Sequence, residues 1–353
     1  MKTPEIVIIG GGFSGLLIAY WLQKEGLRNI QILEARNRLG GRIYTLRSDH
    51  EPPIEMGATW LGKKHRNLLQ LLDELDIDIY QQYMGDKAYY EPMSVSPPQL
   101  VELPPNDEPS YRIEGGTDRI IQKLANSLHQ GQIHSGQTVK TIRKTGTKLE
   151  IKTESDFFKA DYIISTLPPK LLVDSIDFSP SLPEKFTDIA SQTHTWMADS
   201  IKIAMTFDKP FWRNPESSGT IFSNVGPVNE MYDHSDNTHF ALKGFMNNAY
   251  HAVARDQRKQ LVMEQLRRFY GDKVDSYQSY RELVWQKESF SYSKYEQHII
   301  PHQNNGHIRF QEPLFDNRLL IAGSETATEF PGYMDGVVES ARRTIRQLKK
   351  ILS

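Results

Sequence analysis

The sequence predicts an α/β fold in two parts, a domain on a parallel β-sheet and an inserted α+β domain on a mixed sheet. Two wholly apolar runs, residues 6–9 and 319–322, stand near the two ends of the chain and are typical of parallel strands buried on both faces. Between them, runs such as 200–207 and 239–245 alternate apolar and polar residues, which favours a mixed sheet. The parallel sheet is therefore expected to combine separated pieces of the chain.

The first 45 residues predict a complete βαβ unit. Residues 6–9 and 30–33 are expected to be strands, and a mostly apolar stretch over 16–24, closed by Gly26, is expected to be the helix between them. Later patterns predict helices over 65–75, 115–129, 256–269 and 334–352, strands at 138–144, 148–152 and 162–166, and a Pro-rich crossing at 91–109. We accordingly assign 1–75, 111–172 and 305–353 to the first domain, and 76–110 and 173–304 to the inserted domain.

Composition excludes several classes of function. The 353 residues carry a formal net charge of −2, so no basic field indicates nucleic acid or an acidic membrane surface as a partner. The chain has no cysteine, which excludes a disulfide framework, a thiolate metal site and a thiol nucleophile. No metal site is predicted. The N-terminal run is too short for a signal-peptide core, and no apolar stretch approaches the ~20 residues needed to span a bilayer, so we expect a cytoplasmic protein.

A glycine-rich turn follows the first strand directly and precedes the first helix. Its glycines fit the G-x-G-x-x-G pattern, in which they allow a tight turn, close approach of the backbone to a pyrophosphate, and close contact between helix and strand. The helix N-terminus would offer free N–H groups to the phosphates. The sequence therefore predicts a Rossmann-type dinucleotide site at Gly10, Gly12, Phe13, Ser14 and Gly15. An ordinary glycine-rich turn is the alternative.

Glu34 ends the second strand at the position expected of the acidic residue that binds a ribose hydroxyl, about 20 residues after the glycines. The stretch 34–42, EARNRLGGR, adds three arginines suited to phosphate and a pair of glycines. Here the sequence resembles the flavin-containing amine oxidase superfamily, which includes monoamine and polyamine oxidases. The resemblance implies FAD as the cofactor, rather than NAD, in a GR2-like FAD-binding domain with an inserted substrate domain.

Further motifs along the chain carry the same resemblance: 55–62 (EMGATWLG), 113–116, 161–169, 321–327 (IAGSETA) and 331–340 (PGYMDGVVES). They imply that the backbone of Val139 meets the adenine, that Glu325 holds the ribityl–phosphate region, and that the last helix begins at the flavin pyrimidine. The cofactor-binding residues implied in this way are Glu34, Ala35, Arg36, Gly41, Arg42, Gly57, Ala58, Thr59, Trp60, Val139, Thr166, Gly323, Ser324, Glu325, Gly332, Tyr333 and Met334.

Four residues are candidates for the reacting side of the flavin. Lys202 stands in an S-x-K setting before a P-F-W turn, and the resemblance implies that it holds a water against flavin N5; a solvated lysine on a half-exposed strand is the alternative. Tyr295 follows Trp285 by ten residues, as in monoamine oxidases, and with Tyr333 would form an aromatic cage around the amine. Core packing is the alternative for each tyrosine.

Two departures from the family pattern modify these expectations. Lys294 stands where monoamine oxidases attach FAD through a cysteine, so non-covalent FAD is expected, with a link through a histidine as the alternative. Trp60 stands where amino-acid oxidases have the arginine that binds the substrate carboxylate, which favours an amine. The resemblance thus implies oxidation of a small-molecule amine, imine hydrolysis and O₂ as the electron acceptor, giving hydrogen peroxide. A dehydrogenase acting on a C–C bond and a flavin-binding protein without amine turnover are the alternatives, and the oligomeric state stays open.

Overall fold

A five-stranded parallel sheet forms the centre of one half of the protein. The computed structural model describes residues 4–49, 51–105 and 108–353. Strands from three separated parts of the chain lie side by side in the order β20-β13-β1-β2-β9. Their bounds are β1 Ile6–Ile9, β2 Ile30–Leu33, β9 Ile133–His134, β13 Tyr162–Ser165 and β20 Leu319–Ile321.

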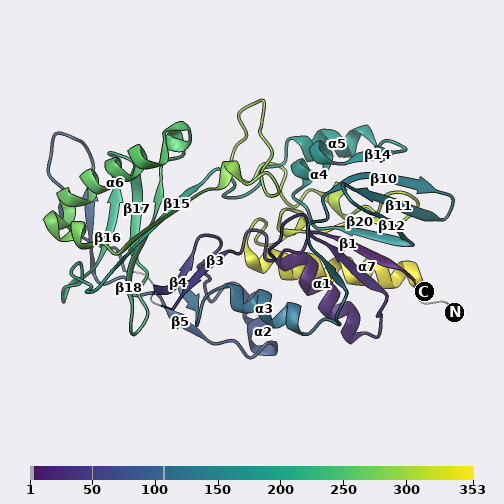
Figure 1. Ribbon diagram of the computed structural model, residues 1–353, viewed down its shortest axis with the longest axis horizontal. Coiled ribbons are helices and arrows are strands. Elements are labelled where there is room, and N and C mark those ends of the chain that lie inside the picture. The colour runs from purple at the N-terminus through teal and green to yellow at the C-terminus, as the bar shows by residue number, and fades with distance from the viewer. Residues whose placement is uncertain (1–3, 50, 106–107) are drawn as a thin grey trace.

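Both faces of this sheet are covered, which explains why its strands are apolar throughout (Figure 1). One set of alternate residues packs with the helices α1 Phe13–Lys24, α2 Arg66–Glu74, α3 Asp118–Asn126 and α7 Met334–Leu352. The other set packs in a second core with a four-stranded sheet, β10 Val139–Thr145, β11 Lys148–Thr153, β12 Phe157–Ala160 and β14 Asp177–Ser179, and with α4 Pro169–Ser175 and α5 Glu184–Ser191. Hydrophobic cores therefore cover both sides of the sheet that carries the glycine turn.

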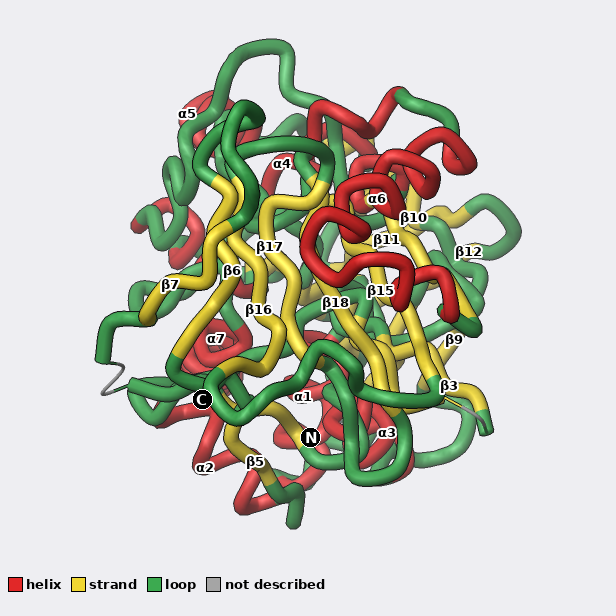
Figure 2. Tube along the Cα trace, turned by 90° about the vertical axis from the view of Figure 1, so that its left-hand side faces the viewer, coloured by secondary structure: helices red, strands yellow, loops and turns green. Residues whose placement is uncertain are grey.

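A seven-stranded mixed sheet forms the other half, in the order β19-β15-β18-β17-β16-β6-β7. All of its strand pairs are antiparallel except β16 with β6. The strands are β6 Lys87–Glu91, β7 Gln99–Glu102, β15 Ile201–Phe207, β16 Ser217–Ser223, β17 Val228–Asp233, β18 Phe240–Met246 and β19 Ser279–Val284. The helix α6, Arg255–Tyr270, covers one face, as Figure 2 shows from the side.

Two small ribbons, β3 Thr45–Ser48 with β4 Glu51–Glu55 and β5 Ile79–Gln81 with β8 Tyr111–Ile113, lie between the halves (Figure 1). The β3–β4 ribbon packs on the face of the large sheet that α6 leaves open, where Ile54 and Met56 meet Ala204 and Ala241. Short 3₁₀ helices complete the chain: η1 Asn248–Ala252, η2 Gly271–Ser276, η3 Trp285–Lys287, η4 Ile308–Gln311 and η5 Ser324–Thr326.

The predicted α/β fold with a mixed second sheet is confirmed, and the predicted elements are present within a few residues of their expected ends. The alternative interpretation of Lys202, a solvated lysine on a half-exposed strand, is wrong, because all seven residues of β15 are buried. The reason is that α6 covers one face of the strand and the β3–β4 ribbon covers the other. The proposed domain boundaries remain a prediction.

Candidate FAD and substrate site

A cavity of about 350 Å³ runs from the glycine turn to the open face of the large sheet. Most of the predicted site residues line it, although they come from all parts of the chain. Those brought together are Gly10, Gly12, Phe13, Ser14, Glu34, Arg36, Gly41, Arg42, Gly57, Ala58, Thr59, Trp60, Thr166, Lys202, Trp285, Gly323, Ser324, Gly332, Tyr333 and Met334. Its size and mostly apolar lining are typical of a cofactor or ligand site.

The glycine turn leaves room for a phosphate at the start of α1. No side chain caps this helix at Gly12, and the hydroxyl of Ser14 is buried without a hydrogen-bond partner among the described residues. A Cβ on Gly12 would touch only backbone at 3.7 Å, whereas a Cβ on Gly15 would lie 2.0 Å from the carbonyl oxygen of Gly10. Gly15 is thus required by the fold itself, and Gly12 keeps space free for a ligand. An unpaired hydroxyl and open helix amides fit a pyrophosphate.

Glu34 is fixed by the loop that it faces. Its Oε2 accepts a hydrogen bond from the Gly11 amide at 2.7 Å, and its Oε1 accepts one from the Arg36 amide at 2.9 Å. Each carboxylate oxygen keeps a further lone pair. Glu34 therefore keeps acceptor capacity for further hydrogen bonds, and its contact with ribose hydroxyls stays a prediction.

Arg36 and Arg42 both line the cavity, and each forms an ion pair with a carboxylate. Arg42 makes a two-pronged ion pair with buried Glu325, with distances of 2.6 and 2.9 Å. Arg36 pairs with Glu288 at 2.9 Å and donates to Ser291 Oγ at 2.9 Å. Glu325 itself does not line the cavity. Arg42 therefore stands between Glu325 and any ligand.

Lys202 lies at the other end of the cavity and is only 5% exposed. Its Nζ donates a hydrogen bond to the carbonyl of Gly57, in the EMGATWLG segment. Burial lowers the pKa of Lys202 to about 8, and the nearby charge of Glu55 opposes that shift. Trp285 is tied to the same segment, because its indole N–H donates to the carbonyl of Met56 at 2.8 Å.

A second buried lysine, which the sequence analysis did not single out, lies beside the same segment. Lys243 of β18 is fully buried, and its Nζ hydrogen-bonds to Thr59 Oγ1 and lies 4.8 Å from the centre of the Trp60 ring. The alternation of 239–245 predicted a strand but gave no sign that this lysine would be covered. Trp60 is positioned further by a hydrogen bond from its indole to Gln82 Oε1 at 3.1 Å.

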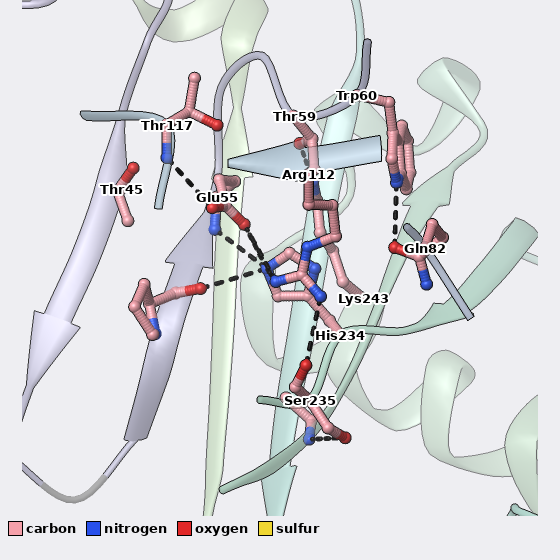
Figure 3. Close-up of polar contacts among 12 residues, drawn as sticks. Thr45, Glu55, Thr59, Trp60, Gln82, Arg112, Thr117, His234, Ser235 and Lys243 are labelled. Carbon is pink, nitrogen blue, oxygen red and sulfur yellow. Dashed lines mark hydrogen bonds and ion pairs between the residues drawn. The ribbon is translucent and has the colours of Figure 1, made fainter. Parts of the chain in front are cut away.

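Glu55 is the centre of a buried polar network behind this wall (Figure 3). Its carboxylate lies 2.5 Å from His234 Nε2 and 3.6 Å from Arg112, and it accepts a hydrogen bond from the Thr117 amide at 3.3 Å. Burial would raise the pKa of Glu55, but contact with His234 and the charge of Arg112 lower it to about 2. Burial and Arg112 lower the pKa of His234 to about 4, against the effect of Glu55. At neutral pH the pair is thus a carboxylate and a neutral imidazole.

The aromatic side chains do not meet as predicted. Tyr333 lines the cavity, with Trp196 at 5.7 Å and His302 at 5.9 Å between ring centres. Tyr295 does not line it: its hydroxyl donates to the Thr193 carbonyl at 2.9 Å and accepts from the Thr195 amide at 2.8 Å. Among the ring contacts of the described residues, none joins Tyr295 to Tyr333. The two tyrosine rings are not in contact in this structure, and the aromatic cage stays a prediction.

The remaining predicted cofactor-binding residues do not line the cavity. Each either adjoins a cavity-lining residue in the sequence or packs in the core. Gly15 lies inside α1, Ala35 follows Glu34, and Val139 begins β10 with its side chain in the second core. Lys294 is exposed. The contact predicted between the Val139 backbone and adenine remains a prediction.

A second cavity, of about 1260 Å³, adjoins the first at Trp60, which lines both. Its other walls come from the segments 81–87, 102–105 and 109–110, with Glu216 and Tyr232. The rings of Tyr232 and Trp60 pack in a T-shaped arrangement at 5.0 Å between centres. Trp60 is therefore the side chain that stands between the inner cavity and this outer one.

Comparison with known families identifies the family of this chain. The chain matches the family described as flavin containing amine oxidoreductase over residues 13–94 and 90–348, and it therefore belongs to that family. It is an FAD-dependent oxidoreductase of the amine oxidase type. Relatives include a probable flavin-containing monoamine oxidase A of Dictyostelium discoideum, 25% identical over 98% of this chain and 97% of its own length. Another is amine oxidase B of Cavia porcellus, also 25% identical, over 98% and 86%.

Solved structures show the same fold. Putrescine oxidase aligns with a TM-score of 0.83 at 20% identity over 99% of both chains. Cyclohexylamine oxidase from Brevibacterium oxydans aligns with a TM-score of 0.85 at 15% identity over the whole of both chains. In the part of the chain that the structure describes, no helix is long and apolar enough to cross a membrane, and no group of three or more His, Asp or Glu side chains could hold a metal ion.

Proposed function

We propose that this protein oxidises an amine to an imine, which water then hydrolyses to an aldehyde or ketone. When bound, FAD would supply the redox chemistry, hydride transfer from the C–N unit and reoxidation by O₂ to give hydrogen peroxide. The observation that carries the proposal is the position of Lys202. Lys202 is buried in the cavity wall and donates a hydrogen bond to the carbonyl of Gly57. Lys202 lies in the S-x-K motif and Gly57 in the EMGATWLG motif, and through both motifs the chain resembles amine oxidases near the flavin ring.

The chain's own residues would bind and orient both molecules. Gly12, Ser14 and Glu34 would hold the ADP half of FAD, and the wall from Gly57 to Trp60 would lie under its flavin ring. Lys202 is mostly protonated below about pH 8, so its positive charge opposes binding of a charged ammonium and favours the neutral amine. Aromatic walls exclude water around the reacting carbon. No further base is then needed.

Anaerobic mixing of the purified holoprotein with a panel of monoamines, diamines and aromatic amines tests the proposal. Loss of the oxidised flavin absorbance with at least one amine, followed by peroxide release on admitting air, is the expected result. An unchanged flavin spectrum with every amine would reject amine turnover. The cofactor is proposed to be non-covalent, because Lys294 is exposed and occupies the linkage position. Acid precipitation should therefore release unmodified FAD.

One observation supports a second candidate, oxidation of an apolar C–C bond. The hydroxyl of Tyr295 hydrogen-bonds to backbone groups, and the residue does not line the cavity. The pair of facing tyrosines that would favour an amine is therefore not formed. Much of the cavity lining is also apolar, including Phe245, Trp60 and Met334. Flavin reduction by cyclic alkenes or other apolar C–H donors, but by no amine, would favour this candidate. A chain that binds FAD and is reduced by neither class would be a flavin-binding protein without turnover.

A further inference from the structure

Lys243 is a fully buried lysine beside the cavity that the proposed chemistry does not use. It lies on the same face of the large sheet as Lys202, because Lys202 pairs across the β15–β18 ladder with Phe245 and Ala204 pairs with Lys243. Diagonal neighbours of this kind lie roughly 7–8 Å apart at the backbone, within reach of long side chains. Two lysines thus extend from one sheet face toward one wall of the cavity.

A chain of hydrogen bonds joins the two amines through that wall. Lys243 donates to Thr59 Oγ1, and the Thr59 hydroxyl donates to the Gly57 carbonyl at 3.2 Å. Lys202 donates to the same carbonyl. Lys243 Nζ also lies over the Trp60 ring, so it contacts both cavity-lining residues of this segment that carry polar groups in their side chains.

The charges around Lys243 favour its neutral form. Among the described residues it forms no ion pair, and the one carboxylate that acts on it, Glu55 of β4, is already in contact with His234 and with Arg112 of β8. Burial lowers the pKa of Lys243 well below its ordinary value, and the charge of Lys202 on β15 lowers it further. Arg112 acts in the same direction and Glu55 against it. One carboxylate cannot balance three buried cations.

We propose that Lys243 is a positioning residue for the reacting end of the cavity: an uncharged amine, coupled to Lys202, that fixes Thr59 and Trp60 where the substrate would lie. This inference rests on the proposed function for the identity of the substrate, but the state of Lys243 does not depend on it. A buried amine costs stability that a methionine of similar length would not. Retaining lysine here exchanges stability for a polar contact in the cavity wall.

Thermal denaturation of the flavin-free protein tests the uncharged state. Lys243→Met should raise the melting temperature at neutral pH, whereas Lys243→Arg, which is permanently charged, should lower it. The gain in Lys243→Met should shrink as the pH rises toward 10.5, because the unfolded lysine loses its proton there. If Lys243→Met is instead less stable than Lys243→Arg, the buried lysine is a charged structural partner and the proposal fails.

Titration of ¹³C-labelled lysines by NMR tests the coupling, again without flavin. The Lys243 signal, identified by its loss in Lys243→Met, should titrate at least about one pH unit higher in Lys202→Met, because a like charge has been removed. Lys170→Met is the matched control, since Lys170 is a buried lysine paired with Asp174. An unchanged Lys243 midpoint in Lys202→Met would show that the two amines are independent.

Steady-state kinetics of the holoprotein test the positioning role. Lys243→Met should keep its flavin content and raise KM for the best amine about tenfold, the loss expected for one hydrogen bond in the site. Unchanged KM and kcat would overturn the positioning role. If no amine reduces the flavin of the unmodified protein, the proposed function has failed, and the melting and NMR results still decide whether Lys243 is neutral and coupled to Lys202.

Discussion

Glu288 forms an ion pair with Arg36 at 2.9 Å across 252 positions of sequence, from the segment after β19 to the segment after β2. Phe290 and Ser291, next to Glu288, line the cavity, and the carbonyl of Phe290 accepts a further hydrogen bond from Arg36 at 3.3 Å. The segment is anchored at its other end by the bond from Trp285 to Met56. It therefore closes one side of the cavity.

Glu288→Gln is expected to speed the release of FAD several-fold. The pair is partly exposed, and such pairs contribute up to about 1 kcal/mol, or a factor of about five. Stopped-flow or dialysis measurement of flavin loss checks this, and Glu296→Gln, on an exposed neighbour, is the control. Equal release rates for both variants and the unmodified protein would show that the segment does not retain the cofactor.

Gly12→Val and Gly15→Ala should separate cofactor binding from folding. Gly12→Val has space within the protein, so it should fold with near-normal thermal stability and lack FAD. Gly15→Ala would place Cβ 2.0 Å from the Gly10 carbonyl and should lower the stability of the flavin-free protein. Flavin content and melting curves measure the two effects. A Gly12→Val protein with a full complement of FAD would contradict the placement of the phosphate loop.

Lys202→Met should retain FAD and slow flavin turnover at least about tenfold, most clearly in reoxidation by O₂. The pKa of about 8 adds a pH dependence: the lysine is charged below that value and neutral above it. Any rate that needs the charge should therefore fall as the pH rises through about 8 in the unmodified protein and stay flat there in the variant. Separate measurement of the reductive and oxidative half-reactions checks this. Identical pH profiles would remove Lys202 from the chemistry.

Tyr333 and Tyr295 should respond differently to substitution. Tyr333→Ala removes a cavity wall and is expected to slow reduction per bound FAD about 10²-fold, the usual cost of lost orientation. Tyr295→Phe removes two hydrogen bonds to backbone and should instead cost about 1–3 kcal/mol of stability, with turnover per flavin nearly unchanged. If Tyr295→Ala and Tyr333→Ala slow reduction equally, the result would support the predicted cage.

His234 should make the protein sensitive to mild acid. Its pKa is lowered to about 4 in the folded state, so the unfolded chain binds the proton first as the pH falls below 6.5. Stability is therefore lost between about pH 6.5 and 4 and is regained as the pH rises. Denaturation curves across this range should show a weaker slope for His234→Gln, and no change for the exposed control His251→Gln. A pH dependence unchanged in His234→Gln would place the acid-sensitive group elsewhere.

The nucleotide end of the site was predictable from sequence, because short-range spacing dictates it. Gly12, Ser14 and Glu34 lie within one βαβ unit, whose geometry follows from local patterns. The reacting end was predicted only in part. Lys202 was identified through its motif, but the burial of Lys243 depends on β4 packing over the sheet, a contact between residues far apart in sequence. Spacing from Trp285 could not reveal where the Tyr295 hydroxyl would bond.

The parallel sheet has a consequence for how the protein matures during synthesis. Its first two strands and its glycine turn leave the ribosome early, but β20 and α7, which complete the sheet and the wall at Gly323 and Met334, come from residues 319–353. A nascent chain therefore cannot close the cofactor cavity before α7 emerges. Until then the early helices keep an apolar face uncovered, and supply of flavin should raise the yield of folded protein by capturing chains in which α7 has already formed.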